Sequence, residues 1–172
     1  MDNVNTSTFI GIGLAEITIV LLLIFVPMPI WLKMILFSAF SILTGFIMRD
    51  VKKSTSEKVL RFAVLSTIGI FIMMALAGVL LAGAGINLGW MGLILLGFLI
   101  GLLVANIVLL FVGDVAIWSR MVAIVGVVVF SIYILVDTNM MQRDYAGDFV
   151  MAAFDYYLDV INLVLSLIRA DS

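Results

Sequence analysis

The feature that most constrains this chain is a series of apolar runs, each about twenty residues long and separated by short polar stretches. A helix of about twenty residues spans the hydrocarbon core of a bilayer and satisfies its own backbone hydrogen bonds there. We therefore predict an all-α polytopic membrane bundle forming a single domain, residues 1–172. The expected membrane helices are 9–26, 30–48, 59–82, 88–112, 115–136 and 149–168.

The composition agrees with a lipid environment and excludes several kinds of chemistry. The chain is 65% hydrophobic and 12% charged, whereas soluble domains are about half apolar and a quarter charged. It has no Cys and no His, which excludes thiolate–histidine catalysis, imidazole metal sites and histidine pH switches. The net charge is −2 and there is no basic stripe, so a nucleic-acid partner is not expected. We expect no cofactor.

The basic residues predict an orientation. Most of them fall on the side of the membrane that holds both termini: Arg49, Lys52, Lys53, Lys58, Arg61, Arg120 and Arg169. The other side receives Lys33 and Arg143. The positive-inside rule then places both termini in the cytoplasm. Which membrane holds the protein is not set by the sequence.

Two glycine pairs match a pattern for close helix packing in membranes. They are Gly85 with Gly89 and Gly97 with Gly101. Such matches are common by chance in a glycine-rich membrane protein, and we interpret both pairs as ordinary helix packing.

The last helix carries polar residues at helical spacing: Asp155, Asp159, Asn162, Ser166 and Arg169. At 3.6 residues per turn they share one face, which must point into the bundle or at water. The opposite face is expected to meet lipid, with Val160, Leu163, Val164 and Leu167. Interhelical polar contacts in membranes contribute only about 0.6 kcal/mol on average. We therefore favour a functional role for Asp159, leave Asp155 open, and interpret Asn162 and Ser166 as packing residues.

Two further acidic residues lie in apolar runs. Asp137 ends the fifth predicted helix, and its position alone favours a helix-end residue at the headgroup level. Glu16 lies about one third of the way into the first helix and needs a partner. We expect either an ion pair with Arg169, on the side that holds both termini, or a proton-bound, neutral Glu16.

At these residues the chain resembles the Bax inhibitor family, also called the transmembrane Bax inhibitor motif family. The similarity is strongest over 128–139 and over 153–163 with Ser166–Arg169, and weaker over 14–16 and 37–45. The resemblance implies a seven-helix fold, a calcium leak across membranes, pH sensitivity and, in eukaryotic members, suppression of cell death. The family's paired aspartates look like Asp137 and Asp159 here. Its second-helix glutamate and closing arginine look like Glu16 and Arg169.

The chain departs from the family pattern in three ways. It is short, as if it lacked the family's first helix, and residues 27–33 replace the basic cluster that follows the family's second helix. A family member without its first helix would also place both termini outside, opposite to the charge bias. The orientation therefore stays open.

These observations lead to one main hypothesis for function. We expect a pH-sensitive cation leak channel for calcium, gated by the pair Asp137 and Asp159. Two close carboxylates in a low-dielectric site cannot both ionise cheaply, so they titrate as a unit. Calcium prefers oxygen ligands, which Asp137, Asp159, Asp155 and Asn162 supply. The expected partners are the bilayer and calcium or other cations.

Two other functions stay open. The first is a non-conducting regulator of cell death or stress that acts through membrane-protein partners. The second is a proton-coupled carrier, although the chain shows no internal repeat of the kind that many carriers have. We do not expect an enzyme, because a histidine zinc site is excluded and no Gly-x-Ser-x-Gly nucleophile motif is present.

Overall fold

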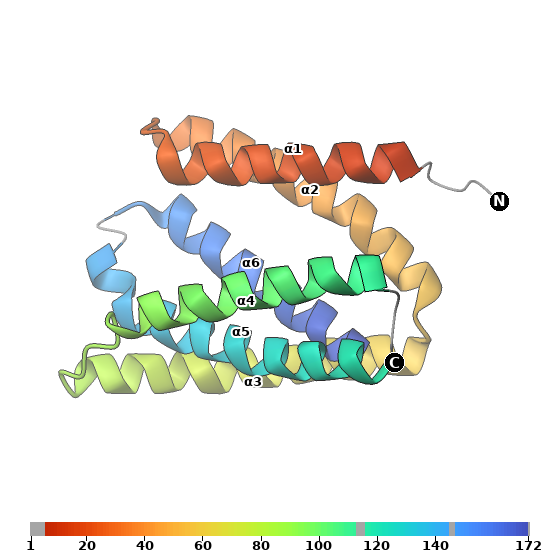
Figure 1. The fold of residues 1–172 in the computed structure, drawn as a ribbon. Helices are drawn as coiled ribbons and strands as arrows, with labels where there is room; N and C mark the ends of the chain where they lie inside the picture. Colours follow the sequence, from red (N-terminus) through yellow and green to blue (C-terminus); the bar gives the residue numbers. More distant parts are fainter. Residues whose placement is uncertain (1–5, 113–115, 145–146, 172) are drawn as a thin grey trace. The chain divides into compact units, whose positions relative to one another are not determined.

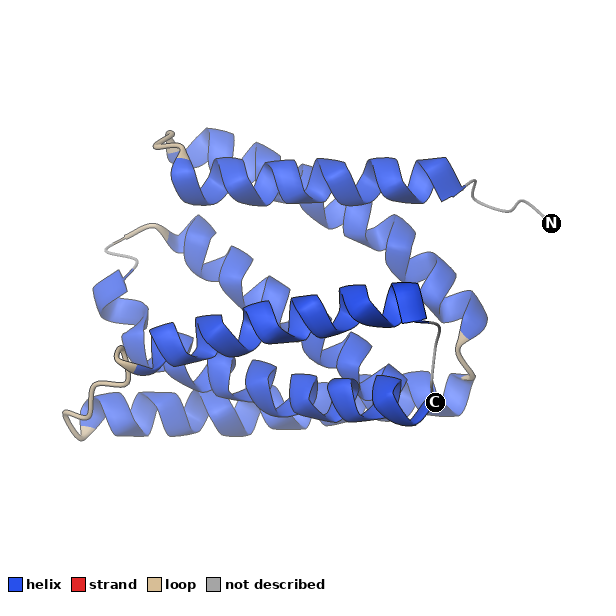
Figure 2. Ribbon diagram, viewed as in Figure 1, coloured by secondary structure: helices blue, strands red, loops and turns tan. Residues whose placement is uncertain are grey.

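The structure is a computed structural model that describes residues 6–112, 116–144 and 147–171. These ranges hold six α-helices and no strand (Figures 1 and 2). The helices are α1 Thr6–Phe25, α2 Ile30–Ser54, α3 Glu57–Gly83, α4 Met91–Val112, α5 Ala116–Asp144 and α6 Phe149–Asp171. The predicted all-α class is confirmed.

Five of the six described helices contain a segment with the length and apolarity of a membrane span. Within the described ranges, α2, α3, α5 and α6 and the segment Met91–Leu109 of α4 are long and apolar enough to cross a bilayer. A shorter apolar segment, Gly11–Phe25, lies in α1. The protein is therefore an integral, multi-pass membrane protein.

Two helices continue well beyond their predicted ends. The second was expected to end at residue 48 and runs to Ser54, and the fifth was expected to end at residue 136 and runs to Asp144. Apolar runs mark the hydrocarbon core, but a helix continues into the headgroup region wherever no proline or glycine stops it. Polar residues at 137–144 are therefore helical.

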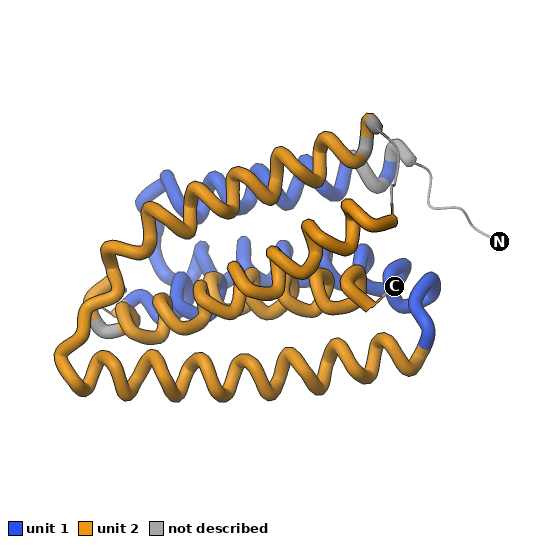
Figure 3. The backbone as a smooth tube through the Cα atoms, turned by 60° about the horizontal axis from the view of Figure 1, so that its bottom comes forward, with its two compact units in different colours: residues 1–56, 148–154 blue, residues 57–147, 155–172 orange. Residues whose placement is uncertain are grey.

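The chain divides into two compact units (Figure 3). Unit 1 is Met1–Ser56 with Asp148–Phe154, and unit 2 is Glu57–Gly147 with Asp155–Ser172. In unit 1, α1 packs against α2. Phe154, fully buried at the start of α6, meets the rings of Phe37 and Phe40 edge to face at centroid distances of 5.7 and 5.3 Å. Because the chain divides into two units, the expectation of a single domain over residues 1–172 stays a prediction.

Unit 2 is organised around α5, which packs against α3 and α4. Leu88, Leu95 and Val136 form a buried apolar cluster in this unit. At Gly78 of α3 the contact with α5 is so close that a Cβ would lie 2.6 Å from the Leu135 carbonyl oxygen. Glycine is therefore required where these helices meet.

The two glycine pairs singled out by their spacing differ in their surroundings. A Cβ at Gly97 or Gly101 would meet nothing within 4 Å among the described residues. Gly85 lies in the turn after α3 with a φ of 79°, a left-handed conformation that suits glycine. The interpretation as helix packing is therefore wrong for Gly97 and Gly101 within the described chain, whereas Gly89 lies so close to the Met140 side chain of α5 that a Cβ there would be 2.9 Å from its Cε atom.

Candidate functional site

The site predicted from the sequence lies on the two helices with the largest buried share. Buried residues make up 44% of the apolar segment of α5 and 39% of that of α6, against 11% in each of α2, α3 and α4. Side chains on α5 and α6 are thus the ones most shielded from the surroundings. Charged groups on them need partners within the protein.

Asp137 of α5 and Asp159 of α6 lie together in unit 2, and their carboxyl groups are close enough for a hydrogen bond between them when one is protonated. Asp137 is partly buried, and Asp159 is only 6% exposed. Oδ2 of Asp159 is buried and has no hydrogen-bond partner. A buried acceptor without a partner is costly and accounts for few groups in a folded protein.

The length of α5 explains how the two aspartates meet. Asp137 lies about two turns before the end of α5 at Asp144, and Asp159 lies about three turns after the start of α6 at Phe149. The two depths differ by only about one turn, so the extension of α5 removes most of the mismatch between the two positions. The prediction that Asp137 lies at the end of a helix is wrong, because α5 continues to Asp144.

Other polar groups surround the pair. Asp155 is close enough to interact electrostatically with both aspartates, and so are the Tyr133 and Tyr156 hydroxyls. The Tyr156 hydroxyl lies 2.7 Å from the Thr138 hydroxyl, and its ring packs edge to face on Phe71. The pair thus sits among oxygen atoms of α5 and α6.

The arrangement offers part of a calcium coordination shell. Calcium takes six to eight oxygen ligands. Among the described residues, no group of three or more acidic side chains is gathered closely enough to hold a metal ion. Asp137 and Asp159 could supply two carboxylates to a cation, and the remaining ligands would have to be hydroxyls, carbonyls or water.

The rest of the polar face of α6 lines a cavity of about 530 Å³ in unit 2. Asn162, Ser166 and Arg169 contribute from α6, and Asn106 of α4 and Ser119 of α5 face the same space. Arg169 donates a hydrogen bond to the Asn106 side chain. The stripe therefore divides into an acidic part near Asp137 and a cavity-lining part that ends in a cation.

The face of α6 opposite the polar stripe does not meet lipid over most of its length. Leu163 is fully buried, and Val164 and Leu167 are each 8% exposed. The spacing correctly grouped the polar residues. It gave the wrong environment for the apolar ones because α6 is covered on more than one face.

Glu16 and Arg169 belong to different units, and each has its own contacts. Glu16 Oε1 lies 2.7 Å from the Thr44 hydroxyl of α2. Arg169 bonds to Asn106. The ion pair between Glu16 and Arg169 stays a prediction, and the Thr44 contact is a partner for Glu16 that the sequence did not suggest.

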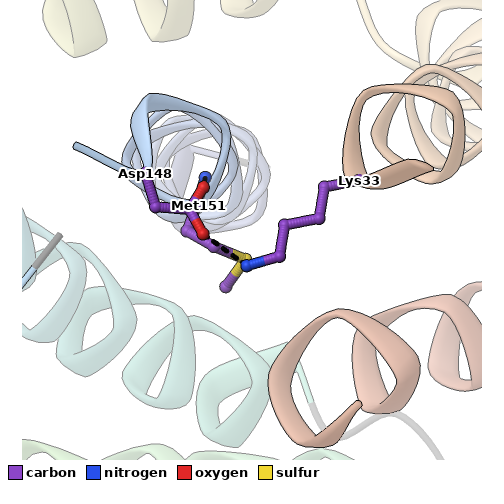
Figure 4. Close-up of polar contacts among 3 residues, drawn as sticks. All are labelled: Lys33, Asp148 and Met151. Carbon is purple, nitrogen blue, oxygen red and sulfur yellow. Dashed lines mark hydrogen bonds and ion pairs between the residues drawn. The ribbon is translucent and has the colours of Figure 1, made fainter. Parts of the chain in front are cut away.

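The structure also contains an ion pair, between Lys33 and Asp148, that the sequence did not predict. Lys33 of α2 donates a hydrogen bond to Asp148 in an ion pair, as Figure 4 shows. The other Asp148 oxygen accepts a 3.1 Å hydrogen bond from the Met151 N–H and so caps α6. Burial raises the pKa of Asp148, but the Lys33 and backbone hydrogen bonds outweigh it and hold the pKa below its usual value. Asp148 directly precedes α6, and the preference of aspartate for this capping position could have indicated its role from the sequence.

Asn139 lies beyond residue 136, the predicted end of the fifth helix, and it is a buried residue of α5. Its amide accepts a hydrogen bond from the Leu88 N–H at 2.9 Å and donates to the carbonyls of Gly78 and Ile86 at 3.3 and 3.0 Å. It thereby ties the turn between α3 and α4 to α5. No spacing in the sequence indicated this role.

The fold and the buried acidic pair define a multi-pass helical membrane protein with an intramembrane carboxyl site. Over residues 2–170 the chain matches the family described as "Inhibitor of apoptosis-promoting Bax1", and it belongs to this Bax inhibitor family. The predicted resemblance is confirmed.

The curated relatives are bacterial membrane proteins. An uncharacterized membrane protein of Streptococcus pyogenes serotype M6 is 30% identical over 142 residues, which cover 78% of this chain and 60% of the relative. One from serotype M3 is 29% identical over the same length and with the same coverage. The chain spans about 60% of the length of the curated relatives it matches.

Proposed function

We propose that this protein is a pH-sensitive cation leak channel for calcium, without enzymatic activity, in which Asp137 and Asp159 act as one titrating unit. The observation that carries the proposal is the contact between their carboxyl groups, together with the buried and unpartnered Oδ2 of Asp159. Ionisable residues inside membrane helices commonly mark ion or proton pathways.

The proton would act as the gate. When one proton is shared, the two carboxyl groups hydrogen-bond and link α5 to α6. When both are ionised, two like charges lie side by side in a low dielectric and repel each other. The helices then separate or the pair takes up a cation, and the two groups titrate together rather than one by one.

A cation would meet an incomplete set of ligands. Asp137, Asp159 and Asp155 supply negative charge, and Tyr133 and Tyr156 supply hydroxyl oxygens nearby. Conduction requires a site that attracts the ion and still lets it leave. A calcium ion held by two carboxylates would keep part of its hydration shell and could therefore leave the site again, as conduction requires.

One observation favours a second function. The family description names an inhibitor of an apoptosis-promoting protein, which suits a non-conducting regulator that acts through membrane-protein partners. In that case the aspartate pair holds helices together, and no ion crosses. A proton-coupled carrier would use the same carboxyl groups but would move calcium only against protons.

Ion flux into liposomes that contain the purified protein separates these functions. Calcium, sodium and proton reporters are followed from about pH 5 to about pH 8, the range that titratable switches use. A channel gives calcium entry that varies with pH and needs no proton counterflow. Coupled proton movement would identify a carrier, and flux no greater than in protein-free liposomes would reject conduction. Asp50→Asn, on the exposed Asp50–Lys53 pair of α2, is the matched control and should behave as the parent.

A further inference from the structure

The cavity lined by Asn162, Ser166 and Arg169 lies near one end of unit 2. Asn106 is about 9 Å from the end of α4, Ser119 is in the first turn of α5, and Arg169 is in the last turn of α6. Figures 1 and 3 show the end of α6 on the side where α4 ends and α5 begins. The apolar segment of α4 ends at Leu109 and that of α5 begins at Ala116, so we place this end of unit 2 near the edge of the hydrocarbon core.

The chemistry of the cavity suits an anion. Arg169 forms no ion pair with any carboxylate in the described part of the chain, and its contact is the neutral Asn106 side chain. The Asn162 amide and the hydroxyls of Ser119 and Ser166 line the same space, whereas the Asn106 amide nitrogen donates to the Leu102 carbonyl. Its volume of about 530 Å³ is within the range of small-molecule sites.

An apolar groove lies beside this cavity. It has a volume of about 570 Å³ and shares Leu102 and Val122 with the polar cavity. Gly97, Gly101 and Trp118 also line it, and side chains at either glycine would have met nothing in the described chain. A polar, cationic space thus borders an apolar groove along α4 and α5.

We propose that this combined site binds an anionic phospholipid, with its phosphate near Arg169 and one acyl chain along Gly97, Gly101 and Trp118. Basic pockets between membrane helices bind anionic headgroups through their charge. Arginine suits phosphate because its planar guanidinium presents several donors at once. This site is separate from the aspartate pair, and the inference does not depend on ion conduction.

Tryptophan fluorescence tests the proposal directly. Trp118 is made the sole tryptophan by Trp31→Phe and Trp90→Phe, and the protein is placed in mixed bilayers of phosphatidylcholine and phosphatidylglycerol. Bromine on the acyl chains of one lipid quenches a tryptophan that the lipid touches. We expect brominated phosphatidylglycerol to be preferred about fivefold at Trp118, which is what one cation near a membrane surface contributes.

Variants and controls locate the effect. Arg169→Gln should bring the preference close to one, and so should Ser119→Leu, which keeps the charge and fills the cavity. Arg61→Gln, which removes a cation of α3 outside the cavity, should leave the preference unchanged. A protein whose sole tryptophan is Trp90, just before α4, should show no preference between the two brominated lipids. Circular dichroism verifies that each variant keeps its helices.

Several outcomes overturn the proposal. Equal quenching by the two lipids at Trp118 would do so, as would a preference that survives both Arg169→Gln and Ser119→Leu. Loss of the preference on adding inorganic phosphate would identify a site for free phosphate. Protection of Trp118 from both brominated lipids would show that a second copy of the chain covers the groove.

Discussion

The carboxyl groups of Asp137 on α5 and Asp159 on α6 lie close enough to interact directly, and Oδ2 of Asp159 is buried without a hydrogen-bond partner. Asparagine keeps the shape of Asp159 and can donate a hydrogen bond to Asp137, whereas leucine cannot. We therefore expect Asp159→Asn to change the free energy of unfolding by less than about 1 kcal/mol and Asp159→Leu to lower it by about 1–3 kcal/mol. Thermal unfolding in detergent measures both. Equal losses for the two substitutions would contradict this assignment of the contact.

Gly78 sets the distance between α3 and α5. An added Cβ would lie 2.6 Å from the Leu135 carbonyl oxygen and 2.8 Å from Thr138 Cβ, so Gly78→Ala should destabilise by about 1–3 kcal/mol. Gly69→Ala on the same helix is the control, because its Cβ would meet nothing within 4 Å. It should stabilise by up to about 1 kcal/mol through helix propensity. Both are measured by the melting temperature, and equal shifts would count against the close helix contact.

Asn139 holds the turn between α3 and α4. Asn139→Ala removes hydrogen bonds to Leu88, Gly78 and Ile86 at a buried position, and it should cost about 1–3 kcal/mol. Asn87→Ala removes one exposed contact in the same turn and should cost less. Hydrogen exchange should also speed up at the Leu88 amide in the Asn139 variant. Unchanged exchange there would show that the turn does not depend on Asn139.

The Lys33–Asp148 contact predicts a specific pH dependence. The pKa of Asp148 is lowered in the folded protein, so its contribution is present above the unfolded pKa of about 3.9 and is lost as pH falls through the folded pKa. Asp148→Asn keeps the cap on α6 but removes the charge, and Asp148→Ala removes both and costs about 1 kcal/mol more.

Melting curves of these two variants and the parent between neutral and acidic pH test this expectation. The parent should be more stable than Asp148→Asn at neutral pH, and the difference should vanish at acidic pH. A difference that persists or grows as the pH falls would have the wrong sign and would reject the ion pair.

The sequence predicted the number of helices and the polar face of α6, because apolar length and helical spacing are local properties. It misplaced the end of α5, since polar residues 137–144 lie outside the apolar run but continue the helix. Because of that error, Asp137 was predicted to lie at the headgroup level, and the role of Asn139 within α5 was not predicted. Partners of Glu16 and Lys33 depend on how distant segments pack, which spacing within one helix does not encode.

The pH dependence of calcium flux in aspartate variants tests the central claim most directly. In liposomes, Asp137→Asn, Asp159→Asn and the double variant are compared with the parent from about pH 5 to about pH 8. If the pair titrates as a unit, each single substitution abolishes the pH dependence and the double substitution adds little further change. Calcium flux through Asp159→Asn that still varies with pH as in the parent would contradict the account.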